Sequence, residues 1–381
     1  MMRILVDALS IGYGGGQTYV REMLPRLAGY PVELHVLISA KGAAGLRAFL
    51  RDGVVIREIP QSASNPFARF AYQRFVLPDL AARQGIDVVF VPGGLTGLRK
   101  RGNGRFKLVS MVQNMLLFER EERQRYRLRS YPKMRLRLWL LSIGHLRTLR
   151  QSDRVIFISN YSARVVKSRL ATVDCRVIHH GGPDLYCGEA SDISAVSKKY
   201  GLERPYLLYV SILDPYKHQD KVIAGFELYM AQNGQRDLSL VLAGPVVGAY
   251  GRQVSRWAEN SRYAVRCLGH VPPEDLPALL RQAEVLLFAS TCECCPFVLL
   301  EYLAAARPII CSDKPPMPEI AGDGAALFVP AMEPAAWAKA LAGVLSRPGL
   351  ARQLAEGAAA RSKVLTWEET ARRTYRALVE W

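Results

Sequence analysis

Two glutamates, Glu293 and Glu301, could together bind a ligand that carries hydroxyl groups. Seven residues separate them, and they bracket the point where a loop that follows an apolar strand runs into a helix. A helix N-terminus presents unpaired backbone N–H groups and the positive end of the helix dipole, so it favours an anion such as a phosphate. A carboxylate does not suit a phosphate, but it accepts strong hydrogen bonds from sugar hydroxyls. A phosphate at the helix start with hydroxyls on both sides describes a nucleotide sugar.

The elements that must position these glutamates are a strand, a loop, a helix and a second strand. Residues 285–288 form a short apolar run of strand type, residues 297–306 a helix, and residues 309–311 another strand. The rest of the chain repeats this alternation, which indicates mostly parallel, doubly wound sheets and an α/β fold. The further expected strands are 3–7, 32–38, 54–59, 88–91, 108–113, 155–159, 177–178, 206–211, 238–243 and 265–268, and the further expected helices are 17–28, 43–51, 67–84, 274–282, 337–345, 351–363 and 367–381.

The spacing of Glu293 and Glu301 is that of an E-x7-E signature, and the chain resembles the family 4 retaining glycosyltransferases. The downstream segment PIICSDKPPMPEIAGDGAALFVP and most of the remaining chain extend the resemblance. The resemblance implies the GT-B fold, in which two Rossmann-like domains face each other across a cleft. The implied parts are an acceptor-side domain at 1–185, a nucleotide-sugar-binding domain at 186–362, and a terminal helix at 363–381 that crosses back to the first domain. An ordinary solvated helix position is the competing interpretation of Glu301.

In the second domain, the resemblance implies which residues bind the donor. Lys217 matches a lysine that binds the donor diphosphate in the family, and the helix start at Pro296 and Phe297 would hold the same group. Glu293 would then bind the transferred sugar, and Glu301 the ribose. Backbone at two further strand ends would complete the nucleotide site, at Gly244 and Val271.

One cation of the family pattern is missing from this sequence. The family has an arginine at the end of the strand before this lysine, but Ser211 and Ile212 stand there. Neutralising the charge of a leaving diphosphate is a large part of catalysis in such a site. Another basic residue, or the Ser211 hydroxyl together with backbone N–H groups, would have to compensate.

A glycine-rich turn follows the first expected strand and contains Gly12, Gly14, Gly15 and Gly16. Glycines let the backbone approach a ligand closely and adopt positive φ angles. A plain strand–helix turn is the alternative, but it needs only one glycine. In the family this loop faces the cleft near the donor phosphate and the acceptor, which implies that role for Gly15 and Gly16.

The strand at 108–113 ends in Gln113 and Asn114, where the family commonly has a His-Asp pair whose histidine reaches the transferred sugar. An amide can hydrogen-bond a hydroxyl, but it cannot act as a base near neutral pH. The resemblance therefore implies that Gln113 and Asn114 position the substrate. His179 and His180 stand where the family has a hinge turn, so we expect hinge residues there and not ligands or bases.

The composition is that of an ordinary globular protein, with 50% hydrophobic residues and a length of 381 residues that allows two cores. The first residues are expected to form a strand and not a signal peptide, and no apolar stretch reaches the length needed to span a bilayer. Seven cysteines, an odd number, favour reduced thiols and a cytoplasmic protein. Cys292, Cys294 and Cys295 are expected to pack inside their loop, and no metal site is predicted, because no partner pair with zinc spacing accompanies them.

The formal net charge of +17 favours anionic partners. Residues 120–154 are densely basic and carry interleaved aromatic side chains, which suits an anionic membrane surface, where each nearby Lys or Arg contributes roughly 1 kcal/mol. A solvated helix face is the alternative interpretation, and nucleic acid is not expected because no recognition motif is present. We therefore expect a peripheral protein on the inner face of the plasma membrane. The basic residues at the start of the stretch are Arg123, Arg125, Arg127, Arg129, Lys133, Arg135 and Arg137.

The resemblance implies a retaining, metal-independent hexosyltransferase that needs no cofactor besides its nucleotide-sugar substrate. The CECCP loop and the segments 216–218 and 316–319 resemble a bacterial polysaccharide subgroup, which favours lipopolysaccharide or exopolysaccharide assembly on a polyprenyl-diphosphate-linked or saccharide acceptor. A GDP-linked mannose or rhamnose is the preferred donor, and a UDP-hexose is the alternative. A non-catalytic nucleotide-sugar-binding or scaffold protein of the same fold stays open, because the family's arginine and histidine are missing.

Overall fold

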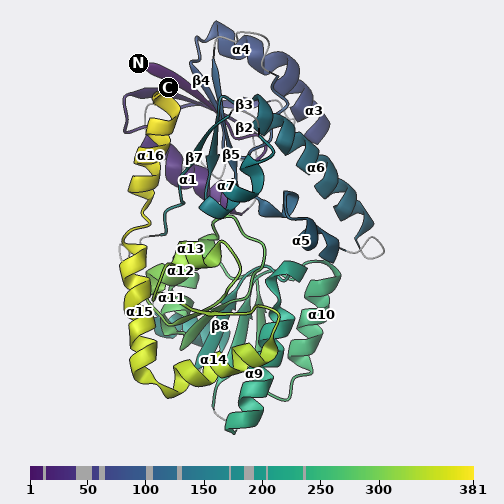
Figure 1. Ribbon diagram of the computed structural model, residues 1–381, viewed down its shortest axis with the longest axis vertical. Helices are drawn as coiled ribbons and strands as arrows, with labels where there is room; N and C mark the ends of the chain where they lie inside the picture. The colour runs from purple at the N-terminus through teal and green to yellow at the C-terminus, as the bar shows by residue number, and fades with distance from the viewer. Residues whose placement is uncertain are drawn as a thin grey trace. The chain divides into compact units, whose positions relative to one another are not determined.

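The computed structural model describes residues 1–11, 14–39, 54–59, 65–99, 106–126, 131–170, 173–183, 193–202, 205–234 and 237–381. The chain divides into two compact units (Figure 1). Unit 1 comprises Met1–Arg120, Lys133–Gly181 and Trp367–Trp381, and unit 2 comprises Glu121–Pro132 and Gly182–Thr366. The helix expected at 43–51, together with Gly12, Arg127 and Arg129, lies outside the described residues.

Unit 1 is built on a parallel sheet with the strand order β3-β2-β1-β4-β5-β6-β7. Its central strands are apolar at nearly every position and buried throughout, as in β4, because helices cover both faces of a doubly wound sheet. The strands are β1 (Met2–Asp7), β2 (Val32–Ser39), β3 (Val54–Ile59), β4 (Val88–Val91), β5 (Lys107–Val112), β6 (Arg154–Phe157) and β7 (Asp174–Val177).

The helices of unit 1 include one that the sequence predicted as a single element and that the structure divides. The helix expected at 67–84 consists of three consecutive helical segments, with a π-helical turn before Pro78, a residue that cannot donate a backbone hydrogen bond. The helices are α1 (Gly15–Leu27), α3 (Pro66–Ala71), the π-helix η3 (Tyr72–Val76), α4 (Leu77–Arg83), the 3-10 turn η4 (Met115–Leu117), α6 (Pro132–Gln151), α7 (Asn160–Lys167) and α16 (Trp367–Val379).

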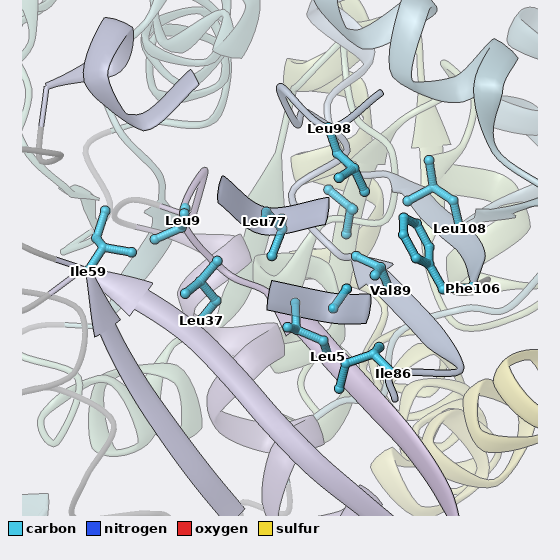
Figure 2. Close-up of a cluster of buried hydrophobic side chains, with 12 residues drawn as sticks. Leu5, Leu9, Leu37, Ile59, Leu77, Ile86, Val89, Leu98, Phe106 and Leu108 are labelled. Carbon is cyan, nitrogen blue, oxygen red and sulfur yellow. The ribbon is translucent and has the colours of Figure 1, made fainter. Parts of the chain in front are cut away.

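A hydrophobic cluster on one face of the sheet joins the strands of unit 1 to α4 (Figure 2). Each fully buried large apolar side chain contributes about 1.5–3 kcal/mol relative to its exposed state. The cluster therefore fixes the ends of β1, β4 and β5, from which the loops of this unit leave the sheet. Its members are Leu5, Leu9, Leu37, Ile59, Leu77, Ala81, Ile86, Val89, Val91, Leu98, Phe106 and Leu108.

The C-terminal helix α16 packs against α1 (Figure 1). Arg154 fixes this helix to the sheet of unit 1. The Arg154 side chain is buried and donates to the backbone oxygens of Ala377 at 2.6 Å and Glu380 at 2.7 Å, while its Nε lies 2.6 Å from the Asp174 carboxylate. These charge-assisted bonds connect the last helix to β6 and β7.

Unit 2 is built on a second parallel sheet, with the order β10-β9-β8-β11-β12-β13. Its strands are β8 (Tyr206–Val210), β9 (Ser239–Ala243), β10 (Val265–Gly269), β11 (Val285–Phe288), β12 (Ile309–Ser312) and β13 (Leu327–Val329). Its helices are α5 (Arg120–Arg125), α8 (Ile193–Tyr200), the 3-10 turn η5 (Pro215–Lys217), α9 (Gln219–Asn233), α10 (Gly248–Glu259), α11 (Leu276–Gln282), α12 (Phe297–Ala305), α13 (Met317–Ala321), α14 (Pro334–Ser346) and α15 (Pro348–Ser362).

Several features of unit 2 were not predicted from the sequence. No expected element covered the ranges of α8, α9, α10 or β13. The segment Glu121–Pro132, which includes most of α5, belongs to unit 2 although the chain before and after it belongs to unit 1.

Both sheets reverse their strand order at one point, between β1 and β4 in unit 1 and between β8 and β11 in unit 2. At such a switch point the two loops that leave the carboxyl ends of the strands diverge and open a crevice, where α/β sheets bind ligands. In unit 2 these loops are residues 211–218 and 289–296, which contain Lys217 and Glu293.

Among the helices of the described ranges, none combines the length and the apolar character that crossing a bilayer requires.

Candidate functional site

The loops after β8 and β11 meet at the switch point of unit 2 through an ion pair. The Lys217 ammonium contacts the Glu293 carboxylate, which also accepts a hydrogen bond from the Ser290 hydroxyl at 2.6 Å. Lys217 and Glu293 stand 76 positions apart in the chain. The structure therefore brings together the two charged residues to which the sequence assigned the donor diphosphate and the sugar.

Lys217 is held by its own turn and by aromatic rings. It ends η5, and its backbone oxygen accepts a hydrogen bond from the Tyr209 hydroxyl at 2.5 Å. Its ammonium lies 5.0 Å from the centroid of the Tyr216 ring and 5.2 Å from that of the Phe288 ring. With the side chain only 9% exposed, these contacts and the Glu293 carboxylate replace the water that the ammonium loses on burial.

The pairing of Lys217 with Glu293 has a chemical consequence for an incoming diphosphate. Two buried opposite charges offset part of the cost of desolvation, and removing one partner leaves the other uncompensated. A diphosphate that reaches Lys217 must share it with Glu293 or displace it. A hydroxyl donated to Glu293 at the same time would compensate that carboxylate.

Glycine at position 244 is required by the backbone that crosses next to it. A Cβ atom there would lie 1.9 Å from the Ser211 carbonyl oxygen, and φ is +150°. The loops after β8 and β9 therefore run in close contact. The Ser211 hydroxyl, a proposed substitute for the missing arginine, donates to the Ile212 carbonyl at 2.9 Å and accepts from the Gln219 amide at 2.8 Å. The Ser211 hydroxyl therefore already has one acceptor and one donor as partners within the protein.

The remaining predicted residues of unit 2 lie on the expected elements. Pro296 occupies the N-cap position of α12, Phe297 is the first residue of the helix, and Glu301 follows one turn later with its side chain partly exposed. Val271 comes two residues after the end of β10 and is buried.

In unit 1, the structure brings Gly16 close to Gln113 at the carboxyl edge of the sheet. A Cβ atom on Gly16 would lie 3.8 Å from the Gln113 amide oxygen, and the Gln113 amide nitrogen donates to the Pro92 carbonyl at 3.0 Å. Gly15 is the first residue of α1. The Asn114 side chain caps η4, because its oxygen accepts from the Leu116 N–H at 3.0 Å.

A buried carboxylate, Asp7, lies at the same edge of unit 1, at the end of β1. It accepts hydrogen bonds from the Gln73 amide at 2.8 Å, the Thr96 hydroxyl at 2.9 Å and the Leu9 N–H at 3.2 Å. Complete burial raises the pKa of Asp7 to about 6 despite these bonds. The sequence prediction included Asp7 only as a strand residue. A carboxylate directly after the apolar run Ile4–Val6 was the signal that could have singled it out.

His180 lies between aromatic rings. Its ring centroid is 5.0 Å from that of Tyr19 and 5.8 Å from that of Trp367, and burial lowers the pKa of His180 to about 3.

Cys292, Cys294 and Cys295 are buried in their loop. Within the described part of the chain, no group of three or more His, Cys, Asp or Glu side chains is arranged to hold a metal ion.

Comparisons with known proteins give the class of this protein, a glycosyltransferase with the GT-B fold, and its family. The family model described as Glycosyltransferase Family 4 matches residues 13–182, and the model described as Glycosyl transferases group 1 matches residues 192–361. The chain belongs to the family 4 glycosyltransferases.

The relatives agree with this family at low identity. The O-antigen chain mannosyltransferase B of Escherichia coli is 27% identical over 175 residues, which are 45% of this chain and 43% of that protein. The D-inositol 3-phosphate glycosyltransferase of a Nocardioides species is 24% identical over 395 residues, covering 95% of this chain and 84% of that protein. HepE (Alr3699) of Anabaena in complex with UDP-glucose superposes with a TM-score of 0.75 at 16% identity and covers all of both chains.

Proposed function

We propose that this protein transfers a hexose from a nucleotide sugar to a lipid-linked or saccharide acceptor. One observation carries the proposal: Lys217 and Glu293 meet at the switch point of unit 2, directly before the helix on which Glu301 lies. A cation for the diphosphate and two carboxylates for hydroxyls are the groups that a nucleotide sugar needs.

In this proposal, each residue has one task. Lys217 and the first turn of α12, at Pro296 and Phe297, hold the diphosphate and stabilise the charge that develops as it leaves. Glu301 binds the ribose, and Glu293 binds the transferred sugar. These residues would supply the electrostatic stabilisation without a bound metal ion, and no cofactor besides the donor is needed.

The reaction would retain the configuration at the anomeric carbon. The bond from that carbon to the diphosphate oxygen breaks while a bond to the acceptor oxygen forms on the same face. The acceptor proton passes to the departing phosphate oxygen, so no protein base is required. The amide at Gln113 fits this scheme, because it can position a hydroxyl without taking its proton.

The donor that we favour is GDP-linked mannose or rhamnose, in the assembly of lipopolysaccharide or another polysaccharide on a polyprenyl-diphosphate-linked acceptor. Similarity to an O-antigen mannosyltransferase supports this choice. A UDP-hexose is the second candidate, and the favouring observation is the structural similarity to a protein crystallised with UDP-glucose.

A panel of nucleotide sugars in a thermal-shift experiment tests the donor site. A ligand at 100 times its Kd stabilises the native state by about 2.7 kcal/mol, so the GDP- and UDP-sugars can be ranked by their effect on Tm. The Lys217→Ala variant should lose the shift. The matched control is Lys221→Ala, since Lys221 pairs with Asp220 at 3.2 Å in the next helix.

Turnover assays decide between the enzyme and the alternative of a non-catalytic binding protein. A nucleotide sugar that raises Tm and is then transferred or hydrolysed supports the proposed function. Binding without turnover on lipid-linked and free saccharide acceptors would favour a scaffold. If no nucleotide sugar changes Tm, the proposal that unit 2 binds a nucleotide-sugar donor is wrong.

We further propose that the protein works at the cytoplasmic face of an anionic membrane, which it contacts through α6. This helix contains no acidic residue, and four large apolar side chains stand on its exposed surface at spacings of three, four and seven. The residues are Leu136, Trp139, Leu140 and Ile143, with exposed fractions of 58%, 56%, 54% and 48%.

Exposed basic residues surround this apolar stripe, namely Lys133, Arg135, Arg137, Arg147 and Arg150. An apolar stripe with cations beside it is the pattern of helices that lie in the lipid interface, where the cations attract anionic headgroups. A cavity of about 370 Å³ is lined by Ile143, Leu146, Arg147, Arg150 and Gln151, at the C-terminal part of α6.

The odd number of cysteines favours a reducing compartment, which agrees with the cytoplasmic face of the membrane.

Sedimentation with lipid vesicles tests the membrane surface. The protein should bind vesicles of phosphatidylglycerol and not of phosphatidylcholine, and Trp139→Ala with Leu140→Ala should weaken binding. Trp257→Ala is the control, because Trp257 is 40% exposed on α10 of unit 2. Equal binding by both variants would exclude α6 as the lipid surface, and tight binding of duplex DNA at moderate salt would favour nucleic acid instead.

A further inference from the structure

The segment Glu121–Pro132 is built into unit 2 at the loops that carry the candidate site. Within it, Glu122 and Tyr126 are 7% and 2% exposed, whereas neighbouring Glu121 is exposed. Burial of a carboxylate and a phenol in a short segment requires specific partners for both. The partners lie on the loops after β8 and β11.

Thr291 is the residue through which Glu122 reaches both loops. The Thr291 hydroxyl lies 2.9 Å from the Glu122 carboxylate and 2.9 Å from His218 Nε2, and its backbone N–H donates to the Tyr216 carbonyl at 3.0 Å. Tyr216 and His218 are the neighbours of Lys217, and Thr291 stands two residues before Glu293. One side chain therefore connects the turn of Lys217 to the loop of Glu293.

The protons in this cluster can be assigned from its chemistry. A hydroxyl has one proton, and a carboxylate is a stronger acceptor for it than the Tyr216 carbonyl, which is 3.4 Å away. Thr291 therefore donates to Glu122 and accepts from His218, whose Nε2 carries the hydrogen. Burial and the nearby Arg125 lower the pKa of His218 to about 4, so the ring is neutral near pH 7.

Within the segment, the Arg125 guanidinium fixes Glu122 by binding both of its carboxylate oxygens, at 2.5 and 3.3 Å. One further contact joins the segment to the Lys217 turn. The Tyr126 hydroxyl donates to the carboxylate of Asp214, the N-cap residue of η5. The segment thus contacts the loop of Glu293 through Glu122 and the loop of Lys217 through Tyr126.

We propose that Glu122 is a positioning residue for the donor site, because it fixes Thr291 and thereby the spacing between Lys217 and Glu293. This inference rests on the proposed function. Glu122 does not contact the donor; it holds the two loops that do. A misplacement of about 1 Å in such a site can lower the rate about 100-fold, so a positioning contact at a distance affects binding and turnover.

Donor binding and kinetics of Glu122→Ala, Glu122→Gln and Glu121→Ala test the inference. Glu122→Ala removes a charged acceptor, so donor affinity should fall about 10- to 100-fold, with the effect on KM for the nucleotide sugar larger than on KM for the acceptor. Glu122→Gln keeps an oxygen for Thr291 and should restore most of the affinity. Glu121→Ala, the exposed neighbour, should match the wild type.

Substitution of Thr291 gives an independent arm. Thr291→Ser keeps the hydroxyl and should bind the donor within about twofold of the wild type, whereas Thr291→Val should resemble Glu122→Ala. The double variant Glu122→Ala, Thr291→Val should be no more than about twofold worse than either single variant, because both act through one contact. Additive losses would overturn the assignment of Glu122 to Thr291.

Amide hydrogen exchange separates this inference from the proposed function, because it needs no donor. Residues 211–218 and 289–296 should exchange faster in Glu122→Ala than in Glu121→Ala. Unchanged exchange overturns the positioning role. Faster exchange with unchanged donor affinity also overturns it, because the contact would then be structural only. A wild-type protein that binds no nucleotide sugar refutes the proposed function, while the exchange still decides whether Glu122 holds the loops.

Discussion

Both sheets reverse their strand order at one switch point, but the loops at their carboxyl edges differ in chemistry. In unit 2, the loops at the switch point bring opposite charges together, since Lys217 contacts Glu293. In unit 1, the corresponding edge presents glycines and an amide, at Gly16 and Gln113, and its carboxylate Asp7 is enclosed by hydrogen-bond donors. The fold repeats, but among the described residues the switch-point loops of unit 2 pair a lysine directly with a carboxylate, whereas Asp7 of unit 1 accepts hydrogen bonds from neutral donors.

The comparison shows that two sheets of one architecture can have sites of different chemistry, because a few loop residues determine that chemistry. The strand order determines where a ligand can bind, and the side chains at the strand ends determine what kind of ligand it is. An edge with a neutral amide suits a hydroxylated acceptor, and an edge with a lysine suits a diphosphate.

The largest expected effect concerns the glycines of the two edges. Gly244→Ala in unit 2 places a Cβ 1.9 Å from the Ser211 oxygen and should lower the free energy of unfolding by about 4 kcal/mol or more. Gly14→Ala in unit 1 meets no atom within 4 Å and incurs only the cost of its backbone conformation, with φ +87° and ψ −148°, about 1–3 kcal/mol. Chemical denaturation of both variants measures the difference. Equal losses would show that the edges are packed alike.

The second effect concerns the charge of unit 2. Lys217→Ala should reduce turnover about 100- to 1,000-fold, the usual loss when one group that stabilises a leaving charge is removed. It also leaves Glu293 buried without its cation. Steady-state kinetics with the preferred donor measure the loss. A Lys217→Ala enzyme with more than a tenth of wild-type activity would place the diphosphate elsewhere.

The third effect concerns Asp7 in unit 1 and the pH. Because the folded-state pKa of about 6 lies above the ordinary value of 3.8, the folded protein favours the protonated carboxyl. The resulting stability is complete below about pH 4 and is lost as the pH rises through 6, which lowers the free energy of unfolding by roughly 3 kcal/mol. In Asp7→Asn this loss should disappear. Denaturation at pH 4, 5, 6 and 7 makes the test, and an unchanged pH profile in the variant would assign the dependence to another group.

The smallest expected effect is that of Glu301→Ala. Loss of a charge-assisted hydrogen bond to ribose, worth about 1.5–3 kcal/mol, should weaken binding of the nucleotide about 10- to 100-fold at most. The stability should change little, because the Glu301 side chain is partly exposed. Titration calorimetry with the free nucleoside diphosphate provides the measurement. A wild-type affinity in this variant would remove Glu301 from the site.

Much of the fold could be predicted because its signals are local. Apolar runs such as 285–288 and 309–311 became strands, and the helix after Pro296 starts where the pattern changes. The helices α8, α9 and α10 were missed. The helix expected at 67–84 proved to be three segments, because periodicity alone does not reveal a π-helical turn. The E-x7-E spacing placed Glu293 on a loop and Glu301 on a helix without knowledge of either unit.

The sequence alone determined the alternation of strands and helices, the family resemblance and the positions of the charged residues along the chain, since each depends on neighbours within a few positions. Only the tertiary structure decided that Lys217 pairs with Glu293 and that Glu122 contacts Thr291 from 169 positions away. The physical reason is that parallel strands bring distant loops to one edge of a sheet. Which loops meet there follows from the strand order, and no short-range pattern records it.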